Sequence, residues 1–166
     1  MTLKVWIDGA CEPVLNNLSS YGLIIEREIK EGYGIDPAGW ELTDEPLLKK
    51  GKIIGSGSAM SNNVAEYSAL ITFFLWYRSC IKNNEDVLIH SDSQLLVNQM
   101  RGLWNINSGK LYTKYAIKAK TILTETNPNI NFKWIPREEN TEADRLSKEV
   151  IIQWQNTNRI KTNETY

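Results

Sequence analysis

The sequence contains only two cysteines, Cys11 and Cys80, and they lie far apart along the chain. Small secreted proteins use many closely spaced cysteines as a disulfide framework, and structural zinc sites need several cysteines or histidines at short spacing. Neither pattern is present here. We therefore expect both cysteines to be free thiols.

A long hydrophobic run is also missing, because no stretch approaches the roughly 18 apolar residues that a membrane-spanning helix needs. The first residues alternate as a strand does and do not resemble a charged leader with a hydrophobic segment and a cleavage site. These features predict a cytoplasmic protein with no membrane partner. The 166 residues predict one domain, expected over 1–155 and monomeric, with a polar tail at 156–166 that we expect to fray.

The sequence has no excess of positive charge. Nineteen Lys and Arg face 20 Asp and Glu, which gives a formal net charge of -1. A protein that holds nucleic acid by its overall charge is expected to be basic, so bulk charge argues against that role. Four carboxylates that held two divalent cations would change the net charge to about +3 and would focus the positive charge at one site.

Residue patterning predicts strands first and then an alternation of helices and strands. The expected strands are 3–8, 21–28, 52–60, 86–90 and 130–135, and the expected helices are 64–80, 93–102, 110–126 and 142–155. Segment 32–50, rich in glycine, proline and acidic residues, fits either a long hairpin extension or an irregular loop. This order predicts an α/β fold with a five-stranded mixed sheet, three antiparallel strands and then parallel strands, and helices on both faces.

Asp8 is unusual because it ends the apolar run 3–7 and is followed by Gly9. Burying an unpaired carboxylate costs on the order of several kcal/mol, and metal binding is the usual compensation. Three more acids, Glu66, Asp92 and Asp144, lie at a strand end or at helix starts. Because ligands collect beyond the carboxyl ends of parallel strands, we expect all four carboxylates to share one cleft.

Three of these acids also have a simpler explanation in helix capping. The candidate caps are Asn63 with Glu66, Ser91 with Gln94 around Asp92 in the first turn, and Thr141 with Asp144. Taken singly, each of the three fits capping better than metal binding. Asp8 has no such alternative, since a strand has no dipole to satisfy. The joint pattern favours a shared site.

The sequence resembles type 1 ribonuclease H in four motifs that occur in that family's order. They are Ile7-Asp8-Gly9, Ser61-Asn62-Asn63-Val64-Ala65-Glu66-Tyr67 with Ala69-Leu70, Ser91-Asp92-Ser93-Gln94-Leu95, and Asn140 leading into Glu142-Ala143-Asp144-Arg145-Leu146-Ser147. The resemblance covers residues 3 to about 150. It implies the ribonuclease H-like fold and an endonuclease that cuts the RNA strand of RNA-DNA hybrids, leaving 5'-phosphate and 3'-hydroxyl ends.

The resemblance further implies that Asp8, Glu66, Asp92 and Asp144 are both the catalytic residues and the metal ligands. Two hard cations roughly 3.5 to 4 Å apart can stabilise the attacking and leaving oxygens of phosphodiester hydrolysis. Ligation by carboxylates alone suits Mg²⁺, with Mn²⁺ as a substitute. We expect Asp8 to bridge two ions, Glu66 and Asp92 to complete the first site, and Asp144 to serve the second.

Contacts to the hybrid are also implied by the resemblance. Positions that match are Gly9, Ala10 and Cys11 along the RNA strand, Asn62, Asn63 and Gln94 as sensors of 2'-hydroxyl groups, and Ser61 at a DNA phosphate. The alternative for Asn62 and Asn63 is a polar turn that precedes a capped helix. We expect little sequence preference, since these contacts read the shape of the duplex.

Two features depart from the best-known members of that family. The loop before Asp144 has no histidine and resembles archaeal-like members; Arg137, Glu138 and Asn140 are candidate assistants, although an arginine cannot act as a base near neutral pH. The single histidine, His90, ends a strand and is expected to be a packed core residue.

The second departure is the absence of the long basic protrusion. Lys110, Lys114 and Lys118 fall on one predicted helical face, where they contact either DNA or, more simply, solvent. Trp104 either packs against a sugar or fills the core, and the other five tryptophans are expected in the core.

Two alternative functions remain open. One is a structure-selective nuclease with the same fold, since a fold does not by itself determine the substrate. The other is a non-catalytic domain that binds hybrids, which would predict the loss of at least one of the four acids. No acid is missing, and the pair Asn62 and Asn63 before Glu66 favours hybrids.

Overall fold

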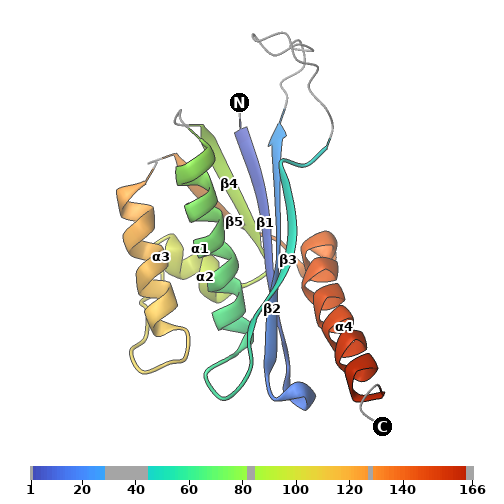
Figure 1. Ribbon diagram of the computed structural model, residues 1–166. Helices are drawn as coiled ribbons and strands as arrows, with labels where there is room; N and C mark the ends of the chain where they lie inside the picture. The colour runs from blue at the N-terminus through green and yellow to red at the C-terminus, as the bar shows by residue number, and fades with distance from the viewer. Residues whose placement is uncertain (1, 29–44, 82–84, 127–128, 164–166) are drawn as a thin grey trace.

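The computed structural model describes residues 2–28, 45–81, 85–126 and 129–163, and it has the predicted α/β architecture (Figure 1). The strands are β1 (Thr2–Glu12), β2 (Leu18–Glu28), β3 (Leu48–Gly55), β4 (Asp86–Ser91) and β5 (Ile130–Trp134). The helices are α1 (Asn62–Cys80), α2 (Gln94–Met100), α3 (Thr113–Glu125) and α4 (Thr141–Asn163), with short 3-10 helices at Pro13–Leu15 and Arg137–Glu139.

The strands form one mixed sheet in the order β3-β2-β1-β4-β5. Strand β1 is central, because it pairs antiparallel with β2 and parallel with β4. The sheet thus joins an antiparallel half to a parallel half, as the sequence predicts. The carboxyl ends of β1 and β4 lie at the same edge of the sheet.

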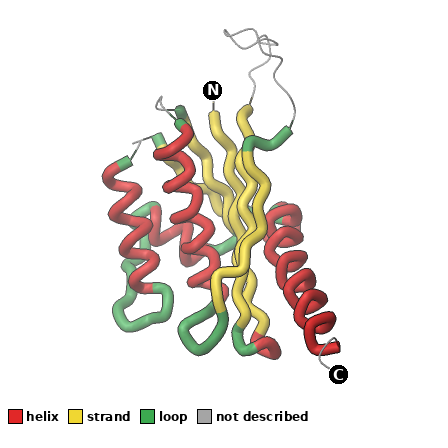
Figure 2. The backbone as a smooth tube through the Cα atoms, in the orientation of Figure 1, coloured by secondary structure: helices red, strands yellow, loops and turns green. Residues whose placement is uncertain are grey.

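Helices cover both faces of this sheet (Figure 2). Helix α1 packs on β1 and β2 and also contacts α3, whereas α2 packs against β4 and β5. Helix α4 packs over β1, β2 and β3 and lies on the other side of the sheet from α1 and α3. Among the described residues, no helix combines the length and the apolar character that crossing a bilayer requires.

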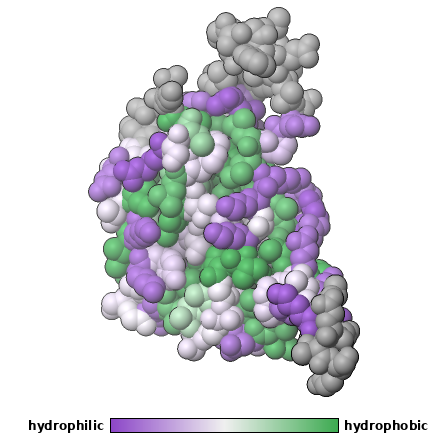
Figure 3. All heavy atoms as spheres, in the orientation of Figure 1, coloured by the Kyte–Doolittle hydropathy of each residue, from purple (hydrophilic) through white to green (hydrophobic). Residues whose placement is uncertain are grey.

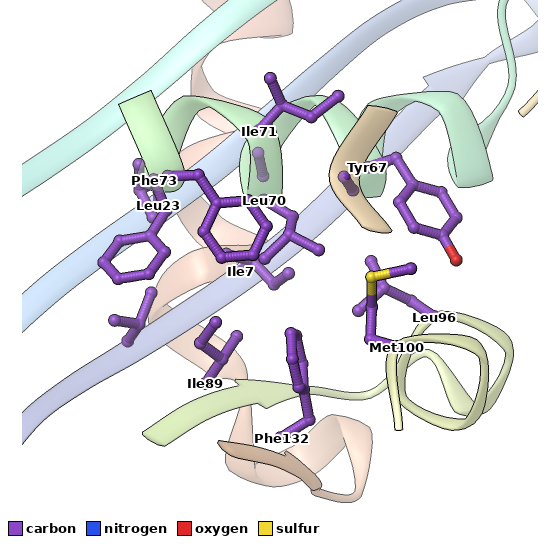
Figure 4. Packing of buried hydrophobic residues seen from close by; sticks show 14 of the residues in the cluster. Ile7, Leu23, Tyr67, Leu70, Ile71, Phe73, Ile89, Leu96, Met100 and Phe132 are labelled. Atoms are coloured by element: carbon purple, nitrogen blue, oxygen red, sulfur yellow. The ribbon is translucent and has the colours of Figure 1, made fainter. Parts of the chain in front are cut away.

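The main hydrophobic core lies between the sheet and α1 (Figure 4). Ile7 and Leu23 from the strands meet Leu70 and Phe73 from α1, and all four are fully buried. Burying a side chain of this size contributes about 1.5 to 3 kcal/mol. The residue stripe that begins at Glu66 and continues through Leu70 and Phe73 therefore faces the core, which fixes the direction from which Glu66 enters the site.

Two glycines allow α4 to approach the sheet closely. A Cβ atom at Gly22 would collide with the backbone of Ala143, and one at Gly51 would lie 2.5 Å from the carbonyl oxygen of Leu146. The hydroxyl of Ser20 donates to the carbonyl of Ser147 at 2.5 Å. These contacts set the height of α4 over the sheet, and Asp144 lies in the same stretch of helix.

The structure corrects several predicted boundaries. Strand β3 ends at Gly55 rather than continuing to residue 60, because Gly57 turns the chain with a φ of +101° and its carbonyl accepts a hydrogen bond from the Met60 amide. The tail does not fray at 156, since α4 continues to Asn163 with no glycine or proline to stop it. Of segment 32–50, residues 48–50 belong to β3 and 32–44 lie outside the described residues.

The tryptophan prediction is partly wrong. Trp134 and Trp154 are 44% and 41% exposed, and Trp104 is 48% exposed. Trp6 and Trp76 are partly buried, and Trp40 lies outside the described residues. A single large side chain near a strand end or on a helix surface carries no sequence signal that distinguishes core from surface.

The prediction for His90 is confirmed. The side chain is 7% exposed, its Nδ1 atom is 3.0 Å from the carbonyl oxygen of Val5, and its ring stacks on Trp6 with centroids 4.8 Å apart. Burial lowers the pKa of His90. A neutral ring in this environment is a packing element, as expected.

Candidate active site

Three carboxylates converge where β4 ends beside β1. Asp8 lies inside β1, which continues to Glu12 and does not end at Asp8 as predicted. Asp8, Glu66 and Asp92 each present one oxygen, and these oxygens all lie within 4.8 Å of one another. The register explains two of them, because Trp6 pairs with His90, and Asp8 and Asp92 each follow that pair by two residues. Asp8 and Glu66 are only 5% and 9% exposed, while Asp92 is partly exposed.

Gly9 is what allows Glu66 to come so close to β1. A Cβ atom at this position would lie 2.6 Å from the Glu66 amide nitrogen and 2.8 Å from the Asn62 carbonyl oxygen. The first turn of α1 therefore packs directly on the backbone that follows Asp8. The carboxylate of Glu66 also accepts a hydrogen bond from the Ser93 side chain, which ties α1 to the start of α2.

Asp144 reaches the cluster from α4. Its carboxyl group forms a hydrogen bond with that of Asp8. Lys148 Nζ lies 2.8 Å from Asp144 Oδ2, and Arg137 Nη2 lies 3.7 Å from Asp144 Oδ1. The structure thus brings together all four predicted acids, with Asp8 between Asp144 on one side and Glu66 and Asp92 on the other. Their catalytic role stays a prediction.

The crowding of negative charge shifts the pKa values in this cluster. Burial, followed by the charges of Asp92 and Glu66, raises the pKa of Asp8 to about 8. Burial also raises the pKa of Glu66 to about 7, against the hydrogen bond from Ser93. For Asp144, burial would raise the pKa, but the hydrogen bonds with Lys148 and Asp8 and the nearby positive charges lower it overall.

Raised pKa values such as those of Asp8 and Glu66 are expected of carboxylates that are gathered to bind a metal. Buried carboxylates that hold protons near neutral pH give them up when a cation takes the place of the proton. The donor set consists only of carboxylate oxygens, which suits a hard divalent cation rather than zinc or copper. The residues present therefore fit a divalent metal site.

Helix capping is achieved by other residues than predicted. The N-cap of α1 is Ser61, whose hydroxyl accepts from the Val64 amide at 3.2 Å, so Asn63 lies inside the helix. The N-cap of α2 is Ser93, which leaves Asp92 before the helix rather than in its first turn. The prediction of Asn63 and Ser91 as N-caps was wrong. Because Ser61 and Ser93 are the N-caps, neither Glu66 nor Asp92 is needed for helix capping.

At α4 the capping prediction also fails. The helix begins at Thr141, and the Asp144 amide donates to the carbonyl of Asn140 at 3.1 Å. Thr141 is therefore the first helical residue and not a cap that precedes the helix. Asp144 does lie in the first turn of α4, as predicted.

A groove of about 380 Å³ opens beside the acids, between the end of β1 and α4. It is lined by Asp144 and by four of the predicted substrate contacts, Gly9, Ala10, Cys11 and Asn62. The remaining predicted contacts, Ser61, Asn63 and Gln94, lie at the starts of α1 and α2.

The loop before α4 contributes one positioning contact and one charge. The Asn140 side chain is 1% exposed and donates from Nδ2 to the carbonyl of Ile7 at 2.9 Å, next to Asp8. Its Oδ1 atom has no hydrogen-bond partner among the described residues. Arg137 points its guanidinium toward Asp144, whereas Glu138 is exposed.

Three side chains at the site were missed by the sequence analysis. Lys148 follows Asp144 by four residues on the same helix, a spacing that predicts an ion pair and offered a usable signal. Ser93 supports Glu66, and the Trp134 indole donates to the Asp92 carbonyl at 3.1 Å. The last two contacts join elements remote in sequence, so no local pattern indicates them.

Comparisons with known proteins agree on one kind of protein. The family described as reverse transcriptase-like matches residues 38–150 of this chain. Bifunctional protein Rv2228c of Mycobacterium tuberculosis is 32% identical over 122 residues, which cover 72% of this chain and 31% of that protein. Ribonuclease HI of Halobacterium salinarum is 30% identical over 116 residues, which cover 68% of this chain and 55% of that protein. The chain thus spans less than two thirds of either relative.

Solved structures give the same result. LC11-RNase H1, isolated from compost by a metagenomic approach, superimposes with a TM-score of 0.72 at 28% identity, covering 93% of this chain and 98% of that one. The structure of LC11-RNase H1 in complex with an RNA/DNA hybrid gives a TM-score of 0.69 at 28% identity, with 89% and 94% covered.

Proposed function

Because this chain belongs to the reverse transcriptase-like family and has the fold of type 1 ribonuclease H, we propose that it hydrolyses the RNA strand of RNA-DNA hybrids. The observation that carries the proposal is that carboxylate oxygens of Asp8, Glu66 and Asp92 lie within 4.8 Å of one another. The carboxyl group of Asp144 is hydrogen-bonded to that of Asp8. Similarity to a protein known in complex with an RNA/DNA hybrid supports the choice of substrate. The products would carry 5'-phosphate and 3'-hydroxyl ends.

The four carboxylates would hold divalent cations, which we propose to be two Mg²⁺ ions with Mn²⁺ as a substitute. Asp8 would contact both ions because it has acidic neighbours on both sides; Glu66 and Asp92 would complete one site and Asp144 the other. When bound, such ions activate water for attack and stabilise the leaving 3'-oxygen. Asn140 would hold the backbone at Ile7, and thereby Asp8, in position.

Basic residues near the acids have a different role. Lys148 and Arg137 keep Asp144 ionised, which a metal ligand requires. The Arg137 side chain is 72% exposed, so its guanidinium is free to donate to a phosphate oxygen of the substrate. Arginine cannot accept a proton near neutral pH, and we therefore assign it to charge stabilisation and not to base catalysis.

Substrate contacts follow from the groove between β1 and α4. We propose that the RNA strand lies along Gly9, Ala10 and Cys11, with Asn62 beside them. Asn63 and Gln94 would read 2'-hydroxyl groups, which both donate and accept hydrogen bonds as amides do. Ser61 already accepts from the Val64 amide, so its hydroxyl proton remains available for a DNA phosphate.

One assay tests the proposal. End-labelled RNA-DNA hybrid, double-stranded RNA, double-stranded DNA and a duplex with a single ribonucleotide are each incubated with Mg²⁺ or Mn²⁺. We expect the wild type to cut the RNA strand of the hybrid and the Asp8→Asn variant to lose at least about 10³-fold in rate, because a shared ligand of both ions is lost.

The other substrates distinguish the alternatives. Preferential cutting of double-stranded DNA would indicate a structure-selective nuclease of the same fold. Hybrid binding without cutting would indicate a non-catalytic domain, and full activity of Asp8→Asn would remove the metal-site assignment. The domain bounds 1–155, the monomeric state and the cytoplasmic location stay predictions; sedimentation of the full chain tests the second of these.

A further inference from the structure

A second groove lies between β3, α1 and α3 and encloses about 530 Å³. Three exposed lysines border it, Lys52 from β3 and Lys114 and Lys118 from α3. Isoleucines 53, 54 and 71 contribute an apolar lining, and no acidic side chain lines the groove. Figure 3 shows this side of the molecule, where hydrophilic residues lie over β3 among hydrophobic ones.

The lysines of this groove differ from the other lysines near the sheet. Lys4, Lys49 and Lys148 each lie 2.8 to 3.0 Å from a carboxylate oxygen. Among the described residues, no ion pair joins an acid to Lys52, Lys114 or Lys118. Like charges four residues apart on α3 repel by a few tenths of a kcal/mol. The groove thus keeps a positive charge that a polyanion would neutralise.

The helix also corrects the predicted lysine stripe. Helix α3 begins at Thr113, so Lys110 precedes it, and only Lys114 and Lys118 share a helical face. Lys120 points elsewhere and donates to the carbonyls of Gln99 and Met100. Lys114 and Lys118 remain on one exposed face, and the strand lysine Lys52 borders the same groove.

The polar groups of the groove select a class of ligand. Ser68 donates its hydroxyl proton to the Val64 carbonyl at 2.7 Å, and Thr72 donates to the Ser68 carbonyl at 2.8 Å. The charged donors are the three lysine ammonium groups, and Tyr21 and Tyr115, whose hydroxyls can also donate, line the groove as well. The ammonium groups act as mobile point charges and do not read shape. Such a set suits the phosphates of a nucleic-acid backbone rather than base edges.

The groove is connected to the candidate active site through two elements. Lys52 pairs with Tyr21 across the sheet, and Tyr21 pairs with Gly9, next to Asp8. On α1, the groove is lined by Ser68 and Thr72, about two to three turns after Ser61, the N-cap residue that is expected to hold a DNA phosphate. The expected RNA contacts lie in the other groove, against α4.

On this basis we propose that the groove bordered by Lys52, Lys114 and Lys118 binds phosphates of the DNA strand of the substrate, away from the cut. The proposal rests on the proposed function. It predicts a contact that contributes binding affinity and salt dependence but takes no part in the chemical step, because no lining residue of this groove belongs to the acidic cluster.

The first test compares two double variants of equal charge change. Lys114→Gln with Lys118→Gln removes two charges from the groove, and Lys4→Gln with Lys133→Gln removes two charges near His90, outside the groove. Binding of an RNA-DNA hybrid is measured without divalent cations at several salt concentrations. We expect the groove variant to bind severalfold more weakly, with a slope of log K against log salt that is smaller by about 1 to 2.

The second test identifies the strand. A series of hybrids carries one uncharged methylphosphonate linkage at successive positions of the DNA strand. We expect one or two positions to weaken binding by the wild type and to have no further effect on the groove variant, because the charge pair is already lost. In cleavage, KM should rise severalfold in the groove variant while kcat stays within about twofold, and Lys52→Gln should add to the effect.

The outcomes separate the two proposals. If the wild type cuts hybrids but the groove variant binds with the wild-type affinity and salt slope, the groove proposal is wrong and the proposed function stands. If no position in the DNA strand interacts with the lysine substitutions, the assignment to that strand is wrong. If the wild type cuts no hybrid, the proposed function fails, and the binding measurements still decide the role of the groove.

Discussion

At the scale of single residues, the site depends on where side chains are absent as much as on where they are present. The carboxylate of Asp8 can lie close to that of Glu66 because Gly9 has no Cβ atom to hold α1 away. Asn140 then fastens the same stretch of β1 through the carbonyl of Ile7. Gly9 and the side-chain amide of Asn140 thus help to position the carboxylates of Glu66 and Asp8.

Gly9→Ala tests this dependence. The added methyl group would have to displace the first turn of α1, since it would lie 2.6 to 2.8 Å from atoms of Glu66 and Asn62. We expect a loss of about 1 to 3 kcal/mol in the free energy of unfolding, measured with urea, as is usual for inserting a methyl group into packed structure. Hybrid cleavage should fall by at least about tenfold.

A variant that keeps both stability and activity would show that α1 moves without cost and that the close approach is not needed. Loss of activity with unchanged stability would instead mean that the methyl group blocks the substrate groove, which Gly9 also lines.

At the scale of elements, α4 brings Asp144 to the site by crossing the sheet over glycines. Gly22 lies opposite Asp8 in the register, and Gly51 lies opposite Gly22. Three adjacent strands therefore present Asp8, Gly22 and Gly51 in one line. The helix backbone rests on the two glycines while its first turn reaches Asp8.

Gly51→Ala should raise α4 from the sheet, because the new Cβ would lie 2.5 Å from the Leu146 carbonyl oxygen. We expect about 1 to 3 kcal/mol of destabilisation and a severalfold fall in cleavage at limiting Mg²⁺ that higher Mg²⁺ partly restores, since Asp144 would be displaced. The measurements are urea unfolding and the dependence of the cleavage rate on Mg²⁺.

Lys50→Ala is the matched control, because successive residues of a strand point to opposite faces and Lys50 faces away from α4. It should change the metal dependence by less than about twofold. An equal change in both variants would mean that β3 as a whole, and not its contact with α4, sets the site.

At the scale of the whole molecule, the acidic cluster joins β1, α1, α4 and the turn after β4 into one electrostatic unit. Without metal this unit destabilises the fold at high pH. The raised pKa of Asp8, about 8, and of Glu66, about 7, means that the folded state binds protons more tightly than the unfolded chain does. That stability is fully present below about pH 4, where both carboxyls are protonated even when unfolded, and it is lost as the pH rises to about 8.

We therefore expect the free energy of unfolding in EDTA to receive a contribution from the cluster that falls steadily between about pH 4 and pH 8. Adding Mg²⁺ should stabilise the protein more at pH 8 than at pH 5, because the cation competes with the bound protons. Urea denaturation across this pH range, with and without Mg²⁺, measures both effects. In Asp8→Asn the fall should be smaller, and an identical pH profile in that variant would contradict the assigned charge coupling.

The sequence by itself determined the order of the elements and the identity of the four acids. Both depend on local patterns: the apolar run that leads to Asp8, the stripe from Glu66 to Tyr77, and four short motifs that occur in one order. That Asp8 and Asp92 share one edge was inferred from the general rule that ligands collect at the carboxyl ends of parallel strands, and the parallel pairing of β1 with β4 agrees with it. The element order and the four acids are readable because each depends on residues close together in the chain.

Only the tertiary structure decided which polar residues cap the helices, how closely α4 approaches the sheet and which lysines lack a carboxylate partner. Ser61 rather than Asn63 caps α1, Arg137 pairs with Asp144, and Lys52 joins two lysines of α3 in one groove. Each of these depends on contacts between residues remote in sequence or on competition between neighbouring caps. Local patterns leave such choices open because their free-energy differences arise only when the elements pack together.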